Sequence, residues 1–133
     1  MDSQIRYCTT SDGVRIAYAV MGSGPPLVRV SGWISHLELD HESPFATLYD
    51  GLAQHFTFVR YDKRGTGLSD RGITDFSIEA RVRDLEAVVA DLKLKKFALF
   101  GFSEGGPIAM TYAAEHPRRV AGLVLSGTFA RPL

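Results

Sequence analysis

The apolar positions of the chain change their spacing repeatedly, and each spacing is typical of a strand or of a helix. Residues 4–10 and 14–21 are rich in β-branched and aromatic residues, and a Ser-Asp-Gly turn separates them. This pattern predicts a β-hairpin. Short, nearly continuous apolar runs are typical of strands that are covered on both faces, as in a parallel sheet. Such runs predict strands at 27–30, 56–61, 97–100 and 120–126.

Between these strands, apolar residues recur every three or four positions, which is the spacing of an amphipathic helix. The clearest case runs from Ser77 to Leu92, and shorter helices are predicted at 44–54 and 104–115. The opposite face of the helix at 77–92 is expected to be solvated; it carries Glu79, Arg81, Arg83, Asp84 and Glu86. Strands that alternate with helices predict an α/β domain with right-handed crossovers.

Composition narrows the class of protein. The chain has 133 residues, is 45% hydrophobic and 23% charged, and is predicted to form a single soluble domain over residues 1–133. Its 15 basic and 15 acidic side chains balance, which argues against nucleic-acid and membrane partners. The lone Cys8 and the absence of an apolar leader lead us to expect a cytoplasmic protein without an internal disulfide.

The strongest chemical signal is the run from Phe97 to Gly106. Gly101-x-Ser103-x-Gly105 falls between a predicted strand and a predicted helix, which is the context of a nucleophile elbow. Small neighbours allow the strained turn, and the helix N-terminus stabilises negative charge that develops beside the serine. A serine that only caps the helix would explain Ser103 but not both glycines.

On these residues the chain resembles the α/β-hydrolase family, and three further segments are similar to that family. They are the loop in 28–33 after the third strand, the Asp-Lys-Arg-Gly-Thr-Gly-Leu-Ser run in 60–70, and the end of the last helix in 112–120. Segments 35–39 and 83–88 look like hydrolase domains that accompany bacterial nucleotide cyclase or transcription-regulator domains. The resemblance implies a truncated α/β-hydrolase fold without the usual cap and C-terminal strands. We expect a mostly parallel sheet of about six strands, with an N-terminal antiparallel hairpin and three helices.

The resemblance also implies an activity, namely that of a serine esterase acting on small uncharged esters without metal or organic cofactor. Ser103 would form the acyl-enzyme, and the backbone amides of Trp33 and Glu104 would form the oxyanion hole. The alternatives are a catalytically silent half-domain that binds a small molecule or a partner chain, and the N-terminal fragment of a longer hydrolase. The Glu104 side chain is expected to add negative charge to the pocket, and candidate pocket walls are Trp33, Phe102 and Phe129.

The general base is the open question, because the family places its acid and histidine after the last strands. His55 and His116 are expected roughly 20 Å from the nucleophile, by strand and helix rise. His36 and His41 follow the third strand at the edge of the sheet that holds Ser103. We therefore predict His36 as the replacement base, although both histidines also fit a solvated polar loop.

Two structural expectations complete the prediction. Asp62, at the end of a strand, is expected to brace the glycine-rich loop that follows it. The strand at 120–126 is expected to be an uncovered edge with a bare apolar face. A homodimer through this strand and face would cover both, and it would also offer a base from the second copy.

Overall fold

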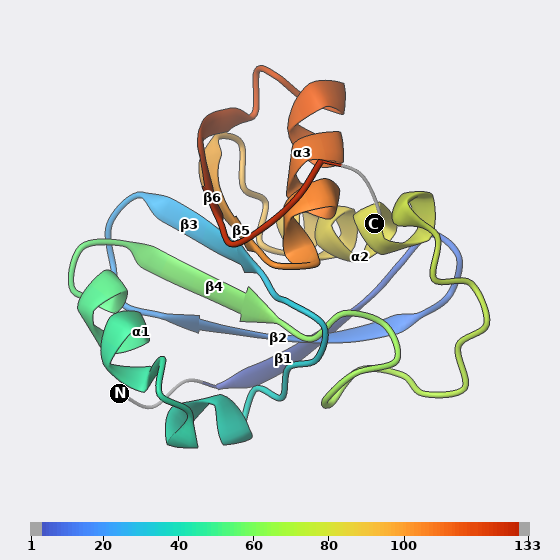
Figure 1. The fold of residues 1–133 in the computed structure, drawn as a ribbon, viewed down its shortest axis with the longest axis horizontal. Helices are drawn as coiled ribbons and strands as arrows, with labels where there is room; N and C mark the ends of the chain where they lie inside the picture. Colours follow the sequence, from blue (N-terminus) through green and yellow to red (C-terminus); the bar gives the residue numbers. More distant parts are fainter. Residues whose placement is uncertain (1–3, 131–133) are drawn as a thin grey trace.

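A computed structural model describes residues 4–130 of the chain (Figure 1). Its strands are β1 (Ile5–Thr9), β2 (Arg15–Met21), β3 (Pro26–Val30), β4 (Thr57–Tyr61), β5 (Phe97–Phe102) and β6 (Val120–Ser126). Its helices are α1 (Ala46–Ala53), α2 (Ile78–Asp91) and α3 (Gly105–Glu115), and a 3₁₀ helix, η1 (Leu39–Glu42), precedes α1. The predicted order of strands and helices is confirmed, and η1 lies in a stretch that was predicted to be loop.

The strands form one six-stranded sheet in the order β1-β2-β4-β3-β5-β6. β1 and β2 form the predicted antiparallel hairpin, and β2 also pairs antiparallel with β4. β4, β3, β5 and β6 pair in parallel, so their carboxyl ends meet at one edge of the sheet. The mostly parallel sheet with an antiparallel hairpin and three helices is the expected fold class.

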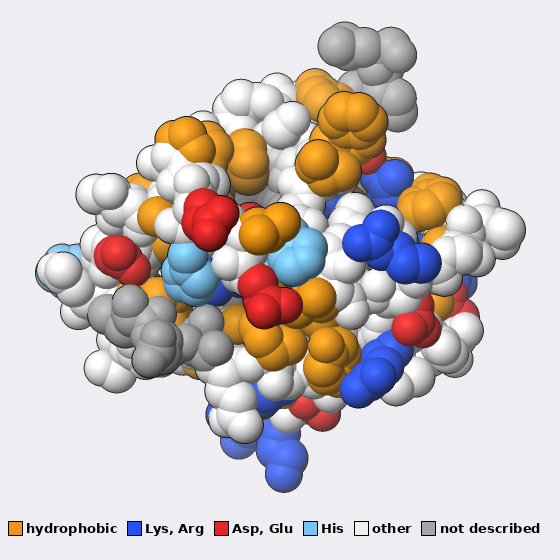
Figure 2. Space-filling view, turned by 90° about the horizontal axis from the view of Figure 1, so that it is seen from below, with side chains coloured by type: hydrophobic (Ala, Val, Ile, Leu, Met, Phe, Trp, Pro, Cys, Tyr) orange, Lys and Arg blue, Asp and Glu red, His pale blue; other side chains and the backbone are white. Residues whose placement is uncertain are grey.

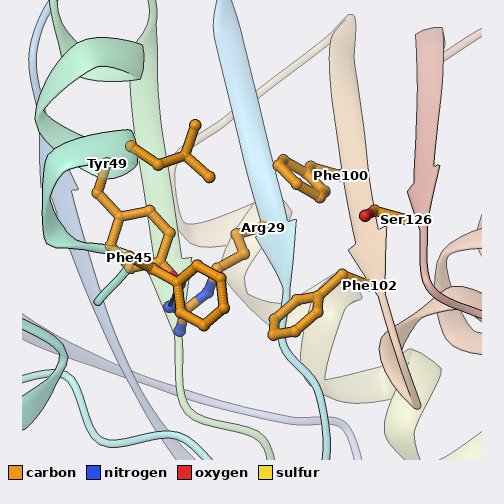
Figure 3. A pocket seen from close by; sticks show the side chains of 7 residues that line it. Arg29, Phe45, Tyr49, Phe100, Phe102 and Ser126 are labelled. Atoms are coloured by element: carbon orange, nitrogen blue, oxygen red, sulfur yellow. Dashed lines mark hydrogen bonds between the residues drawn. The ribbon is translucent and has the colours of Figure 1, made fainter. Parts of the chain in front are cut away.

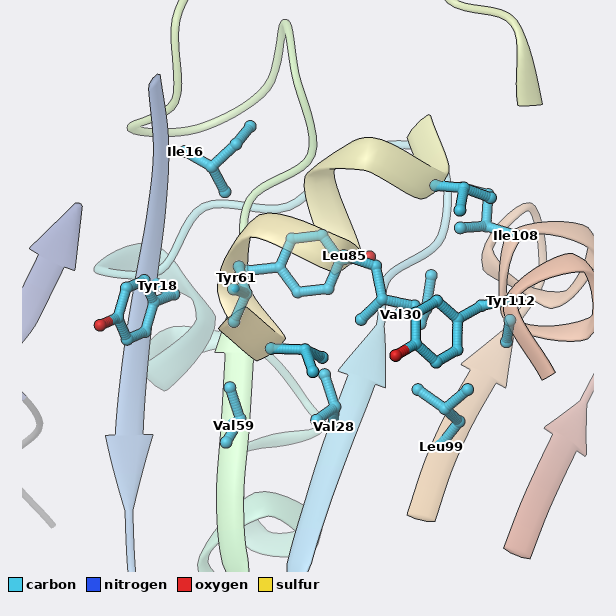
Figure 4. Close-up of a cluster of buried hydrophobic side chains, with 14 of the residues drawn as sticks. Ile16, Tyr18, Val28, Val30, Val59, Tyr61, Leu85, Leu99, Ile108 and Tyr112 are labelled. Atoms are coloured by element: carbon cyan, nitrogen blue, oxygen red, sulfur yellow. The ribbon is translucent and has the colours of Figure 1, made fainter. Parts of the chain in front are cut away.

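Helices cover both faces of this sheet. Val28 and Val30 of β3 point towards α2 and α3, in a core that also holds Tyr61, Leu85 and other side chains drawn in Figure 4. The alternate residue Leu27 faces α1 instead, where it packs in a smaller cluster around Tyr49. Strand alternation therefore makes the two faces of the sheet chemically distinct, with Arg29 on the α1 face.

β6 forms one edge of the sheet and is poorly covered, as predicted. Six of its seven residues are exposed. Leu123, Val124 and Leu125 keep 37%, 52% and 41% of their surface accessible. An exposed apolar edge strand presents unpaired backbone groups and a surface that favours association.

The prediction of a solvated outer face on α2 is wrong at Asp84. Its carboxylate is fully buried and accepts hydrogen bonds from Nε of Arg64 at 2.9 Å and from the Arg64 backbone amide at 3.0 Å. The loop after β4 folds over this part of α2, and the pairing with Arg64 makes burial of the carboxylate tolerable. At the start of the same helix, the Ser77 hydroxyl caps the backbone amide of Ala80, in agreement with the predicted boundary.

Candidate active site

Ser103 occupies the sharp turn between β5 and α3. Its φ is +51°, a left-handed conformation that is uncommon for a residue with a side chain. A Cβ on Gly105 would lie 2.2 Å from the carbonyl oxygen of Val30, and a Cβ on Gly101 would lie 2.9 Å from the Cβ of Ala109. Both glycines are thus required by close packing of the helix on the strands, and the strained serine between them is the predicted elbow.

Hydrogen bonds fix the backbone of this turn on both sides. The Ser103 amide donates to the carbonyl oxygen of Ser126 at 3.1 Å. The Ser103 carbonyl oxygen accepts from the Thr128 hydroxyl and, at 3.2 Å, from the Gly106 amide. The Ser103 hydroxyl, by contrast, has no hydrogen-bond partner among residues 4–130. The turn is therefore held rigidly while its hydroxyl stays available.

The two predicted oxyanion donors are also available. Within the described residues, the backbone amides of Trp33 and Glu104 have no acceptor. The loop that carries Trp33 lies against the nucleophile, since a Cβ on Gly32 would be 3.4 Å from the Cβ of Ser103. Unpaired amides beside a nucleophile are the requirement for stabilising an oxyanion. The Trp33 side chain is 77% exposed.

A cavity of about 650 Å³ opens beside Ser103, between α2 and α3. Its walls include Phe76, Pro107, Met110 and Phe129. The size and the mainly apolar lining suit a small organic molecule. Of the other candidate walls, Phe102 lines a separate pocket on the α1 face, and Trp33 lines a neighbouring pocket of about 200 Å³ with Lys63.

Charge at this cavity differs from the expectation. Glu104 lines it but forms an ion pair with Arg81 of α2, so its negative charge is offset. The helical pattern predicts Arg81 on the solvated face of α2, and it does not predict the ion pair with Glu104. Nearby, Lys63 is 3% exposed, and burial lowers its pKa to about 8 against the opposing influence of Glu104.

Asp62 takes the bracing role that the sequence predicted. Its carboxylate is fully buried and accepts from the Leu68 amide at 2.9 Å, the Leu37 amide at 3.2 Å and the Ser35 hydroxyl at 2.6 Å. It thereby ties the glycine-rich loop after β4 to the loop after β3. The three groups that donate to this carboxylate belong to these loops, so the side chain acts on the scaffold.

The predicted base is not joined to the nucleophile by a hydrogen bond in the described residues. Nδ1 of the half-buried His36 accepts from the Leu39 amide at 3.4 Å. No hydrogen bond in the described residues joins either ring nitrogen of His36 to Ser103. His41, the other candidate, lies in η1.

Among residues 4–130, one group of side chains could reach a metal ion, at the far end of α3 from Ser103. Ligand atoms of Glu86, Glu115 and His116 lie within 4.8 Å of one another. Both carboxylates are exposed, and the His116 ring packs on Tyr112 at 4.5 Å between centroids.

Comparison with known proteins places the chain in a family. Residues 25–133 match the alpha/beta hydrolase fold family, so the chain belongs to it. An esterase from a Rhodococcus species has the same fold with a TM-score of 0.83 and 32% identity over 95% of this chain and 46% of its own. A soluble epoxide hydrolase from a Corynebacterium species is 32% identical over 79% of this chain. A human serine hydrolase-like protein is 34% identical over 85%.

The chain spans 35% of that epoxide hydrolase and 55% of the human protein. An esterase and an epoxide hydrolase share the fold, so the fold by itself leaves the reaction open. The described part of the chain contains no helix long and apolar enough to cross a membrane.

Proposed function

We propose that the chain carries the nucleophilic centre of a serine esterase that acts on small uncharged esters. The observation that carries the proposal is the strained Ser103 with a free hydroxyl beside the unpaired amides of Trp33 and Glu104. Ser103 Oγ attacks the ester carbonyl, the two amides hold the oxyanion, and the alcohol leaves to give an acyl-enzyme that water hydrolyses. The likeness to the Rhodococcus esterase supports an ester as substrate.

The cavity supports an uncharged substrate. Phe76, Met110 and Phe129 give it apolar walls, and the ion pair of Glu104 with Arg81 offsets charge near the nucleophile. An anionic ester would lose its hydration on entering the cavity, and none of these groups offers an unpaired positive charge in return. Binding of such an ester would therefore be unfavourable. A neutral acyl group of modest size fits the walls best.

Serine needs a base to become a strong nucleophile, and we propose His36 for this role within the chain. The role requires the ring to release the Leu39 amide and to present an unprotonated nitrogen to Ser103. The other source of a base is a second copy, docked through the exposed β6 edge as a homodimer. A sedimentation mass of 14.6 kDa at micromolar concentration would contradict the dimer.

Hydrolysis of p-nitrophenyl acetate by wild type, Ser103→Ala and His36→Ala tests the proposal. We expect Ser103→Ala to abolish turnover and His36→Ala to lower it about a hundredfold, a usual contribution of a general base. His55→Ala, on the exposed turn before β4, is the control and should retain full activity. Equal rates for wild type and Ser103→Ala would overturn the proposed esterase activity. An unchanged rate for His36→Ala would exclude His36 as the base but would leave Ser103 as the proposed nucleophile.

A catalytically silent binding domain is the second candidate, favoured by the absence of a base in contact with Ser103 among residues 4–130. A fluorophosphonate reagent separates the two. Labelling of wild type but not of Ser103→Ala supports an activated serine. No labelling of either protein supports the silent domain.

A further inference from the structure

The pocket beside Trp33 shares two walls, Phe76 and Arg81, with the cavity at Ser103. Its volume is about 200 Å³. Its apolar walls are Trp33, Ile34 and Phe76, and its basic walls are Lys63, Arg64 and Arg81. Basic and hydrophobic side chains also lie together in Figure 2, on the right of the molecule, where Figure 1 places the loop between β4 and α2. The pocket therefore combines apolar contact area with basic groups.

Lys63 is the basic wall whose charge has no bonded partner. Arg64 pairs with two carboxylates, and Arg81 pairs with Glu104. Nζ of Lys63 forms no hydrogen bond or ion pair within residues 4–130, although the residue is only 3% exposed. Polar groups that are nearly buried are usually paired, so an unpaired lysine that lines a pocket marks a candidate site of chemistry.

Nζ of Lys63 is also accessible. In the pocket on the α1 face (Figure 3), Nε and Nη2 of Arg29 are unpaired but have almost no accessible surface, so a ligand in that pocket does not meet them. Nζ of Lys63, by contrast, keeps accessible surface. Since Lys63 lines the pocket beside Trp33, a small molecule in that pocket can approach the amine.

The surroundings of this nitrogen favour the neutral amine over the ammonium ion. Burial is the largest influence, and it lowers the pKa of Lys63 to about 8. The positive charges of Arg81 and Arg29 act in the same direction. The carboxylates of Glu104 and Asp84 act in the opposite direction, but each is bonded to an arginine. A lysine that is desolvated beside cationic groups is an activated nucleophile.

We propose that Lys63 is a covalent site for small aromatic aldehydes, which enter the pocket beside Trp33 and form a Schiff base at Nζ. The lone pair of the neutral amine attacks the carbonyl carbon, and the π electrons of the C=O bond move to oxygen. Proton transfer from nitrogen to oxygen gives a carbinolamine, which loses water and leaves a C=N bond. That water carries the aldehyde oxygen and both amine hydrogens, so the step needs no other reactant. The proposal does not rest on the esterase activity of Ser103.

The walls favour an aldehyde with a single aromatic ring. Trp33 and Phe76 are 77% and 45% exposed, so their rings are open to contact with a ligand ring. A cavity of roughly 150 Å³ holds benzene, so a pocket of about 200 Å³ is large enough for benzaldehyde. A short aliphatic aldehyde gains little from these walls.

Reductive labelling of wild type with benzaldehyde and sodium cyanoborohydride at pH 7 tests the proposal, because the hydride converts the Schiff base into a stable amine. Peptide mass spectrometry then gives a labelling rate for each lysine. The other lysines of the chain, Lys93, Lys95 and Lys96, are exposed and serve as internal controls. At pH 7 an amine with a pKa of about 8 is roughly one-tenth unprotonated, against about 0.04% for an unperturbed lysine.

We expect Lys63 to be labelled at least about tenfold faster than each exposed lysine, and we expect this preference to disappear in concentrated urea. Labelling of Lys63 at the same rate as the exposed lysines, or more slowly, would overturn the proposal. A preference that persists in urea would also overturn it, because the pocket would then not be its cause.

Substitutions at Ile34 test the pocket without changing Lys63. Ile34 is 70% exposed, so changes there are compatible with folding. Ile34→Glu places a carboxylate at the pocket, where it stabilises the ammonium form, and should slow labelling of Lys63 about fivefold relative to the matched Ile34→Gln. The rates at Lys93, Lys95 and Lys96 should not change. Equal Lys63 rates in the two variants would contradict the proposal.

Discussion

The buried arginines of this molecule differ in how many carboxylates they bind. Arg64, in the loop after β4, has two carboxylates: Nε donates to Asp84 at 2.9 Å, while Nη1 and Nη2 donate to Asp12 at 2.9 Å and 3.0 Å. On the α1 face of the sheet, Arg29 and Arg60 share the single carboxylate of Asp40. Arg64 thus has two carboxylate partners of its own, whereas Nη1 of Arg29 and Nη1 of Arg60 meet at one carboxylate oxygen.

Titration separates Arg60 from the other two arginines, because the partners of Arg64 and of Arg29 outweigh burial and raise the pKa of both. Hydrogen bonds from Arg64 hold the pKa of Asp12 well below its ordinary value. Burial and the neighbouring charge of Arg29 lower the pKa of Arg60, as expected where like charges are close. A complete set of partners makes Arg64 a brace between the β1–β2 turn, the loop after β4 and α2. Arg29, by contrast, keeps Nε and Nη2 buried without a hydrogen-bond partner in the described part of the chain.

The largest loss of stability is expected when the fully buried carboxylate partner of Arg64, that of Asp84, is removed. Asp84→Ala leaves the Arg64 guanidinium buried with a lost charge partner, and this should lower the free energy of unfolding by about 3–5 kcal/mol. Urea denaturation measures the change. Glu86→Ala, at an exposed position on the same helix, is the control and should change stability by less than about 0.5 kcal/mol. A loss below about 1 kcal/mol for Asp84→Ala would show that the brace is dispensable.

Much of the fold could be predicted because it follows from local patterns. Apolar runs and helical spacing identified the strands and helices, and Gly101-x-Ser103-x-Gly105 identified the elbow, since the motif is short and lies between a predicted strand and a predicted helix. The brace of Asp62 was predictable for the same reason, because one of its partners, Leu68, lies six residues away.

The buried charges could not be predicted, because each depends on a partner that is distant in the sequence. Arg29 lies within an apolar run, and its inward position becomes tolerable through Asp40 of η1, eleven residues later, and Tyr49 of α1. Asp84 matched the polar face of an amphipathic helix, yet it pairs with Arg64, twenty residues away. Periodicity shows which face a residue is on but not which other element covers that face.

A smaller and pH-dependent loss of stability is expected when the more exposed carboxylate partner of Arg64, that of Asp12, is replaced. Asp12→Asn removes the charge that Arg64 and Arg83 bind and should cost about 1–2 kcal/mol at pH 7. Because the pKa of Asp12 is lower in the folded protein than in the unfolded chain, its stabilisation is complete above about pH 4 and is lost as the pH falls further. Urea denaturation from pH 7 to pH 2.5 should therefore show the two proteins converging in acid. Asp50→Asn, at an exposed site on α1, provides the control, and a difference that is constant with pH would contradict the assignment.

The smallest effect on stability is expected at the under-partnered arginine. Arg29→Met loses the bonds to Asp40 and Tyr49, but it also removes two buried, unpaired donors and the repulsion of Arg60, and Asp40 keeps Arg60 as a partner. Removal of one member of a buried ion pair is costly mainly when it leaves the other charge without a partner. Asp40 keeps Arg60, so the free energy of unfolding should change by less than about 1 kcal/mol. Thermal and urea unfolding beside wild type and Arg118→Met, a control at an exposed arginine, measure this change. A loss of about 3 kcal/mol or more would mean that Arg29 is a structural brace like Arg64, with its partners complete, and the contrast between the two arginine groups would fail.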